Sequence, residues 1–286
     1  MIKYIFNREI DRNKYDTAVK NALNTRVYAC SWYLDAVADD WDVLVLEDYK
    51  AVMPLPRRKK YTLNYIYLLP WVQQLGIFSN EKISENLIKA FIKKIPGKYA
   101  LVDYYFNSGN HFKSKYLTKR TNYILPLDSN LDIIIKSFNS NRRRILKKDF
   151  SNYTINKQGD REEFLGMYRQ TEKNFTLSED AVEKLQNLLN TKQDSVHIWN
   201  VYQENKLLAG LLFLKDQKRI TYLLPVASAE AKKNNLPSFI VSELIKSYQN
   251  TGFILDFEGS MIEGVAGFYK SFGAEEEVYF HYKKIL

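Results

Sequence analysis

An internal repeat is the feature of this sequence that most restricts its fold. The segment Tyr67-Leu-Leu-Pro recurs as Tyr222-Leu-Leu-Pro. Each copy is followed by a polar loop, by apolar residues at helical spacing, and by a short β-type run with an aspartate, Asp103 in the first copy and Asp256 in the second. Similar features in the same order indicate that one supersecondary unit has been duplicated.

The helix after each copy is predicted from its apolar spacing. In the first copy the apolar side chains recur at helical intervals over residues 83–92, and the pattern ends at Pro96-Gly97. In the second copy Pro237 suits a first helical turn, apolar residues follow over 240–248, and Thr251-Gly252 ends the segment. Both copies therefore predict a helix with one buried face.

The strands of the two copies also correspond. The aspartates lie in β-type runs at 99–106 and 253–257, and each copy is preceded by two β-type runs around a polar turn, at 43–53 and 197–214. We therefore predict an α/β (α+β) protein whose two domains are related by the repeat. The boundary is expected near Leu125-Pro126, which gives domains of 1–125 and 126–286.

Composition narrows the class of protein. Hydrophobic residues make up 45% of the chain and charged residues 26%, which is enough apolar material for sizeable cores. The single Cys30 excludes an internal disulfide and a cysteine-rich zinc site, and the three histidines lie far apart in the sequence. The start of the chain lacks the pattern of a signal peptide, and no segment has the ~18–20 apolar residues of a membrane helix. We expect a soluble, cytoplasmic protein without a bound metal or membrane span.

The net charge of +9 is concentrated in local clusters. One is Arg57-Arg58-Lys59-Lys60, a second surrounds Lys119 and Arg120, and a third is Arg142-Arg143-Arg144. Such clusters attract phosphates, nucleic acids or anionic headgroups. Each is equally compatible with a solvated basic surface.

The order of elements in each copy, helix, antiparallel strands, loop, helix and strand, resembles the acyl-CoA N-acyltransferase (GNAT) fold. The segment 268–273, Phe-Tyr-Lys-Ser-Phe-Gly, is similar to the closing helix of that superfamily, which has a tyrosine four residues before a glycine. The duplication and the arginine-rich linker resemble the FemAB-like branch and its CelD-like relatives. This resemblance implies two tandem GNAT-like domains, a pair of splayed strands that admits the donor, and transfer of an acyl or aminoacyl group to an amine.

The expected donor loop departs from the GNAT pattern. GNAT enzymes usually hold the CoA pyrophosphate on a glycine-rich loop at a helix N-terminus, but residues 227–237 contain no glycine. The resemblance allows acyl-CoA or aminoacyl-tRNA as co-substrate, with no permanently bound cofactor. The residues expected at the donor are Ser228, Ala229, Lys232 and Lys233.

Candidate catalytic residues lie in the second copy. Asp256 and Glu258 are two apart in a predicted strand, so both side chains face the same side, where a carboxylate can accept a proton from an amine. They are equally compatible with a strand end and a helix cap. The resemblance implies that Tyr269 protonates the leaving group and that Lys270 stabilises an oxyanion. Tyr269 is also compatible with core packing.

Candidate substrate-binding residues are spread over both copies. They are expected to hold phosphates or to contact a small-molecule or peptide-like amine acceptor in a cleft between the lobes. These residues are Arg142, Arg143, Arg144, Gln73, Gln74, Trp32 and Asp103. Each of these residues also has an alternative without a function. The two glutamines are compatible with an exposed turn, Trp32 with a core position, and Asp103 with a purely structural role.

Two functions follow from these observations. The first is an acyltransferase that takes its acyl or aminoacyl group from CoA or tRNA and acts on an amine, such as a cell-envelope precursor. The second is a non-catalytic binding module whose basic cleft contacts RNA or a phosphate-bearing ligand. The absence of the glycine-rich loop favours the second; the match over 268–273 favours the first.

Overall fold

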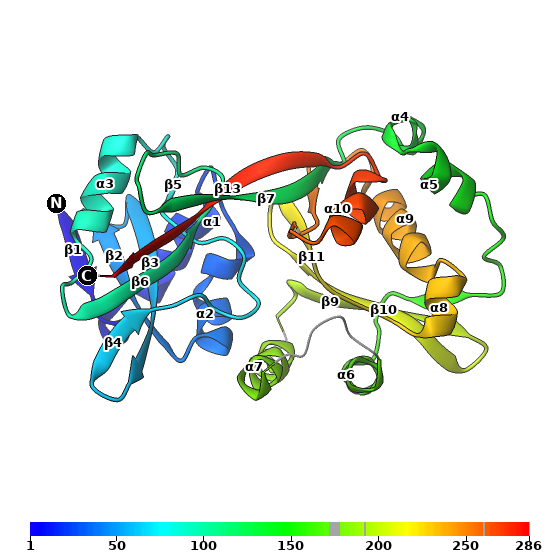
Figure 1. The fold of residues 1–286 in the computed structure, drawn as a ribbon, viewed down its shortest axis with the longest axis horizontal. Coiled ribbons are helices and arrows are strands. Elements are labelled where there is room, and N and C mark those ends of the chain that lie inside the picture. Colours follow the sequence, from blue (N-terminus) through cyan, green and yellow to red (C-terminus); the bar gives the residue numbers. More distant parts are fainter. Residues whose placement is uncertain (172–177, 192, 260, 286) are drawn as a thin grey trace. The chain divides into compact units, whose positions relative to one another are not determined.

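The computed structural model describes residues 1–171, 178–191, 193–259 and 261–285. The chain forms two compact units (Figure 1). Unit 1 consists of Met1–Thr121, Ser178–Thr191 and Val278–Leu286, and unit 2 of Asn122–Leu177 and Lys192–Glu277. None of the helices in the described part of the chain is both long and apolar enough to cross a membrane.

Unit 1 is built on a mixed sheet with the strand order β1-β2-β3-β4-β6-β13, and β5 pairs with β3. Its neighbouring strands are antiparallel except for the parallel pair β4 and β6. The predicted hairpin at 43–53 is confirmed as β2 and β3. The strands are β1 (Ile2–Ile5), β2 (Asp40–Leu46), β3 (Ala51–Lys60), β4 (Leu63–Ile66), β5 (Phe78–Ser79), β6 (Tyr99–Phe106) and β13 (Glu275–Ile285).

The helices of unit 1 include the one predicted from the first copy of the repeat. That helix, α3 (Glu85–Lys93), begins after Ser84, whose side chain accepts a hydrogen bond from the N–H of Leu87 at 3.2 Å, and it buries Ile88 and Phe91. The others are η1 (Asn7–Glu9), α1 (Arg12–Lys20), η2 (Val27–Ala29), α2 (Ser31–Val37) and α7 (Glu179–Asn190).

Unit 2 repeats this architecture with the strand order β7-β12-β11-β10-β9-β8. Again one pair is parallel, β11 with β12, and its other pairs are antiparallel. The predicted hairpin at 197–214 is confirmed as β9 and β10. The strands are β7 (Leu117–Pro126), β8 (Thr154–Asn156), β9 (Val196–Gln203), β10 (Lys206–Lys215), β11 (Arg219–Ala227) and β12 (Ile254–Asp256).

The helix predicted from the second copy is α9 (Leu236–Tyr248), with Pro237 in its first turn. Ile240, Val241, Leu244 and Ile245 form its buried face, and burying each such side chain contributes roughly 1.5–3 kcal/mol. Figure 1 shows α9 and α6 on opposite faces of the unit 2 sheet, and both contact β9, β10 and β11. The other helices are α4 (Leu131–Ser137), α5 (Ser140–Ile145), α6 (Arg161–Gln170), α8 (Ala229–Lys233) and α10 (Glu263–Lys270).

Gly273 ends α10 in the way that its sequence motif predicts. Its φ of +73° lies in the left-handed region, and its N–H donates to the carbonyl of Lys270 at 2.9 Å. A Cβ at this position would lie 2.1 Å from Oγ of Ser137. Glycine is therefore required here by both the turn and the packing.

Two strands connect the units. The boundary between the units falls within β7, between Thr121 and Asn122, and within β13, between Glu277 and Val278. β7 follows β6 in the chain but pairs with β12 of unit 2. β13, the last strand of the chain, pairs with β6 of unit 1. The predicted domain boundary at 125 and 126 stays a prediction, and unit 1 also includes Ser178–Thr191 and Val278–Leu286 from the C-terminal half.

Candidate active site in unit 2

The parallel strands of unit 2 pair over only part of their length. Pairing of β11 with β12 covers Arg219–Thr221, but β11 continues to Ala227. The edge of β11 beyond Thr221 is therefore open on the β12 side. Pro225 lies in this stretch, and proline, which has no N–H, is tolerated in a strand where no neighbour needs that donor.

A pocket of about 520 Å³ lies at this open edge. We call it the unit 2 pocket. Its volume falls within the range of small-molecule sites, and most of its lining is apolar. It is formed by β11 together with α6, α8, α9 and α10, through Tyr168, Thr171, Tyr222, Leu224, Pro225, Val226, Ala227, Lys232, Pro237, Gly264, Val265, Phe268 and Tyr269.

Two tyrosine hydroxyl groups distinguish the pocket. The rings of Tyr222 and Tyr269 meet edge to face with centroids 6.0 Å apart. Within the described residues neither hydroxyl has a hydrogen-bond partner, although the two side chains are 4% and 7% exposed. Burial raises the pKa of both phenols, and the charges of Glu258 and Asp256 raise that of Tyr269 further. Both phenols are therefore protonated donors at neutral pH.

A β-bulge in β11 helps to shape this wall. In the register with β10, Leu212 faces Leu224 and Phe213 faces Tyr222, so Leu223 has no direct partner. A bulge locally changes the direction of neighbouring side chains and is frequent beside active sites. Tyr222 was not among the residues expected at the site. It belongs to the repeated Tyr-Leu-Leu-Pro motif, which could have indicated it.

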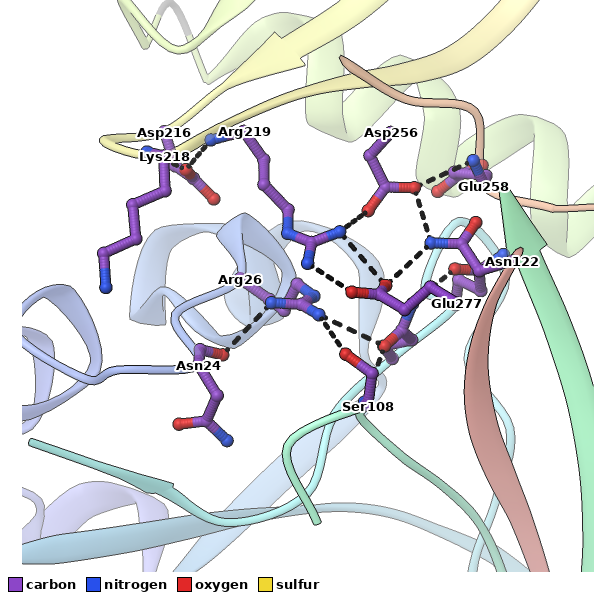
Figure 2. A network of polar contacts seen from close by, with 12 residues as sticks. Asn24, Arg26, Ser108, Asn122, Asp216, Lys218, Arg219, Asp256, Glu258 and Glu277 are labelled. Atoms are coloured by element: carbon purple, nitrogen blue, oxygen red, sulfur yellow. Dashed lines mark hydrogen bonds and ion pairs between the residues drawn. The ribbon is translucent and has the colours of Figure 1, made fainter. Parts of the chain in front are cut away.

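Asp256 lies in a buried charged network and not on the pocket wall (Figure 2). Its Oδ2 accepts from Nη1 of Arg219 at 2.7 Å, and its Oδ1 accepts from Nδ2 of Asn122 at 2.9 Å and from the N–H of Glu258 at 3.0 Å. Arg219 also donates to Glu277 at 2.6 Å. Both oxygens of the Asp256 carboxylate are thus engaged.

Glu258 follows β12 with its backbone in the left-handed region, at φ +58°. Its N–H is fixed by Asp256, as Figure 2 shows, which makes Asp256 a cap for the turn after the strand. Arg219, Asn122 and Glu277 were not among the residues expected at the site. The sequence gives no local signal for them, because they come from three strands that are far apart in the chain.

Lys270 is on the exposed side of α10. Its ammonium forms an ion pair with Glu276 at 2.8 Å and lies 5.3 Å from the ring centre of Tyr123. The hydrogen bond to Glu276 raises the pKa of Lys270. Lys270 is not among the residues that line the unit 2 pocket, whereas its neighbour Tyr269 is.

The loop before α9 lacks glycine but contains the start of the short helix α8. The N–H groups of Lys232, Asn234 and Asn235 donate to the carbonyls of Ser228, Glu230 and Lys232. The N–H of Ala231 donates to the side chain of Ser228 at 3.0 Å. These four N–H groups are therefore engaged within the loop, and only the first N–H groups of α8 remain for a phosphate.

The expected donor residues occupy different places. Ser228 caps α8, and Ala229 is the first residue of that helix. Lys232 and Lys233 are exposed, and Lys232 lines the unit 2 pocket. Phosphate contacts at this loop could thus come from the side chain of Lys232 and from the first N–H groups of α8.

The three arginines of the cluster lie in α5, but their side chains have different environments. Arg142 is 6% exposed, and its Nε donates to Oγ of Ser271 at 2.9 Å. Arg143 and Arg144 are exposed and bond locally, to the carbonyl of Lys136 and to Oδ1 of Asn141. Consecutive helical residues point in different directions, so the three side chains do not converge on one point.

The corresponding opening in unit 1 is closed by the chain itself. Leu75 forms a bridge with Phe106: its N–H donates to Tyr105 at 3.1 Å, and its carbonyl accepts from Asn107 at 2.8 Å. The cavity beside these residues has a volume of only about 10 Å³. The two copies of the repeat therefore differ at the position where a donor would enter.

The glutamines and the tryptophan predicted to bind substrate lie in unit 1, where they contact other residues of the same unit. Gln74 is completely buried and its Oε1 accepts from the N–H of Ser108 at 3.0 Å, while its Nε2 donates to Gln73 at 2.8 Å. Trp32 is half-buried on α2, where it packs edge to face with Tyr33.

Asp103, on β6, is engaged by two side chains of β13. It forms an ion pair with Nζ of Lys283 at 3.3 Å, and its Oδ1 lies 2.5 Å from Nε2 of His281. These bonds join two paired strands of unit 1, so they are sufficient to explain an aspartate at this position.

The sequence matches no protein-family model and no curated protein. Solved structures, however, share its fold. FemX is 14% identical with a TM-score of 0.69, and the match covers 98% of this chain and 97% of FemX. A tandem GNAT protein from the clavulanic acid biosynthesis pathway is 8% identical with a TM-score of 0.55, over 99% and 98% of the two chains.

A third structure, L-PGS from Bacillus licheniformis, is 17% identical with a TM-score of 0.53, over 85% of this chain and 83% of that one. At such identities the likeness concerns the fold. It agrees with the splayed strands of unit 2 and with the same strand order in both units. The chain therefore has the tandem GNAT fold that FemX also has, as its resemblance to the FemAB-like branch predicts.

Proposed function

We propose that this chain is an acyltransferase whose unit 2 pocket holds the reacting end of an activated acyl or aminoacyl donor. The observation that carries the proposal is the open edge of β11, with a pocket of about 520 Å³ whose lining includes Tyr222 and Tyr269. A flat or extended acyl group suits the apolar wall, and the hydroxyls suit its carbonyl oxygen.

The proposed reaction is direct transfer. The amine nitrogen of the acceptor attacks the acyl carbon, a C–N bond forms, and the bond to the leaving sulfur or oxygen breaks. Tyr269 is protonated at neutral pH and lines the pocket, so we assign it the role of proton donor to that leaving group. Tyr222 is suited to donate a hydrogen bond to the oxygen that becomes negative.

The proton of the attacking amine needs an acceptor, for which Asp256 and Glu258 stay the predicted candidates. Both oxygens of Asp256 are already engaged by Arg219, Asn122 and the N–H of Glu258. We therefore assign Asp256 a positioning role. Its bonds hold β12 and the following turn, and with them Phe257, against Tyr269.

The donor is tested by offering the full chain labelled acetyl-CoA and charged tRNA in parallel, each with a mixture of primary amines. Transfer from either supports the proposal and identifies the donor. Both donors are offered because a tandem GNAT protein and L-PGS share the fold of this chain. The acceptor, a small-molecule or peptide-like amine such as a cell-envelope precursor, and the cytoplasmic location stay predictions.

A non-catalytic binding module is the second candidate. The observation in its favour is the loop 228–235, which lacks glycine and uses the N–H groups of Ala231, Lys232, Asn234 and Asn235 internally. Such a module would bind a phosphate-bearing ligand or RNA and transfer nothing from either donor. Binding of CoA or tRNA without transfer, measured in the same samples, would favour it over the enzyme.

A further inference from the structure

Arg142 is a buried cation in unit 2. Its guanidinium carbon lies 4.7 Å from the ring centre of Phe268 and 4.3 Å from that of Phe272. Nε donates to Oγ of Ser271 at 2.9 Å, and Nη1 donates to Oγ of Ser238. Two aromatic rings and two neutral hydroxyls thus surround a group that carries a full positive charge.

No carboxylate compensates this charge within the described part of the chain. Arg219, the other buried arginine of unit 2, lies between two carboxylates at 2.7 and 2.6 Å, but Arg142 forms no ion pair with a described residue. Burial lowers the pKa of Arg142 to about 10, with Tyr222 acting in the opposite direction. The guanidinium therefore stays charged at neutral pH, and its burial is unfavourable unless an anion is present.

The ends of two helices meet at Arg142. Ser271 follows the last residue of α10, and the carbonyl end of a helix favours a cation. Ser238, in contrast, is the third residue of α9, so Nη1 points to the positive end of that helix. A cation beside a helix N-terminus is a repulsive arrangement, and an anion placed there would interact favourably with both.

Arg142 lies one side chain away from the unit 2 pocket. Phe268, on which it stacks, lines the pocket, and so does Pro237, the neighbour of its hydrogen-bond partner Ser238. The only charged side chain among the described lining residues is the cation of Lys232. The described wall of the pocket thus contains one cation and no acidic residue, and Arg142 lies behind Phe268.

We propose that Arg142, with the hydroxyl of Ser238 in the first turn of α9, binds an anionic oxygen group of the ligand that enters the unit 2 pocket. This inference rests on the proposed function, because it takes the pocket as the substrate site. The group is a phosphate or a carboxylate. Two N–H bonds of Nη2 and one of Nη1 remain for it, and the hydroxyl proton of Ser238 can add a fourth donor.

The test is anion binding by the full chain, followed by thermal unfolding at constant ionic strength. The probes are inorganic phosphate, pyrophosphate, acetate and succinate, each compared with chloride. The variants are Arg142→Met, which keeps the stacking length without the charge, Arg142→Lys, which loses the forked donors, and Arg143→Met as the exposed control from the same helix.

We expect the parent and Arg143→Met to be stabilised equally by one class of anion, and Arg142→Met to bind that anion at least about 10-fold more weakly. Without anion, Arg142→Met should unfold at the same temperature as the parent or higher, because a buried unpaired charge has been removed. A response only to phosphates or only to carboxylates identifies the source of the anionic group.

Equal responses of the parent and both Arg142 variants would overturn the proposal, and so would a parent that no probe stabilises. If Arg142→Met does not fold, Arg142→Lys decides: affinity equal to the parent counts against the proposal, and weaker affinity supports it. The measurement needs no transfer activity. A negative result for anion binding therefore leaves the acyltransferase proposal intact. Conversely, if the chain proves not to be an acyltransferase, an anion response that depends on Arg142 still stands.

Discussion

Phe257 stacks on Tyr269 with ring centroids 4.7 Å apart and planes inclined by 24°. Phe257 directly follows Asp256, whose carboxylate is held by Arg219. Its N–H donates to the carbonyl of Tyr123 at 2.9 Å. The buried network is thus connected through one aromatic side chain to a hydroxyl in the unit 2 pocket.

Tyr269→Phe removes the hydroxyl and keeps the stacked ring. We expect transfer to fall by about 10²–10⁴, the usual contribution of a proton donor. The unfolding temperature should stay within error of the parent, since the hydroxyl has no partner among the described residues. Tyr222→Phe, with its hydroxyl in the same pocket, is the matched comparison. Full activity of Tyr269→Phe would remove this residue from the chemistry.

Arg219→Met removes the cation that pairs with Asp256 and Glu277 in the interior of unit 2. We expect a loss of stability of about 3–5 kcal/mol, which is typical when one partner of a buried ion pair is removed. Asp256→Asn keeps the shape and should cost less. Lys206→Met, in an exposed pair with Glu230, serves as the control. Denaturant titrations measure these differences, and equal effects of the Arg219 and Lys206 variants would contradict the assignment.

Lys270→Met tests the role that the GNAT resemblance implies for this residue. Because Lys270 is exposed and, among the described residues, is paired only with Glu276 and Tyr123, the unfolding temperature should change little. A rate reduced by about 10²–10³ would place the ammonium at the developing oxyanion. An unchanged rate would agree with its position outside the pocket wall.

Gly264→Trp should fill the pocket without disturbing the fold. Gly264 lines the unit 2 pocket, and an added Cβ would meet no atom within 4 Å. Gly267→Trp is the matched control, because it has the same freedom on the same helix but does not line the pocket. We expect loss of transfer or binding only in the first variant. Both should unfold at or above the parental temperature, since glycine weakens a helix by roughly 0.5–1 kcal/mol.

Asp39 makes the stability of unit 1 sensitive to acid. Burial acts to raise the pKa of this carboxyl, but hydrogen bonds from Arg58 and Lys184 lower it to about 2. Because the folded pKa lies below the unfolded value of about 3.9, the stabilisation is complete above pH ~4 and is lost as the pH falls towards 2. Asp39→Asn should flatten the pH dependence of stability in this window, and an unchanged slope would contradict it.

The pattern of elements and the duplication could be read from the sequence because they depend on neighbouring residues. The spacing of apolar side chains predicted α3 and α9, and the turn glycine predicted the end of α10. The repeated order of these elements predicted the tandem GNAT fold. Such features need only local periodicity and turn chemistry, which a single sequence contains.

The character of the site was decided by tertiary structure. Leu75 closes the opening in unit 1, whereas the corresponding edge of β11 is open. Arg142 is buried while the next two arginines are exposed, and Arg219 meets Asp256 across strands that are distant in the chain. Side chains acquire such partners, and lose water, only when long-range packing brings the strands and helices together. The repeat and the family resemblance therefore predicted the fold, whereas the partners of the buried charges in unit 2 were decided by long-range packing.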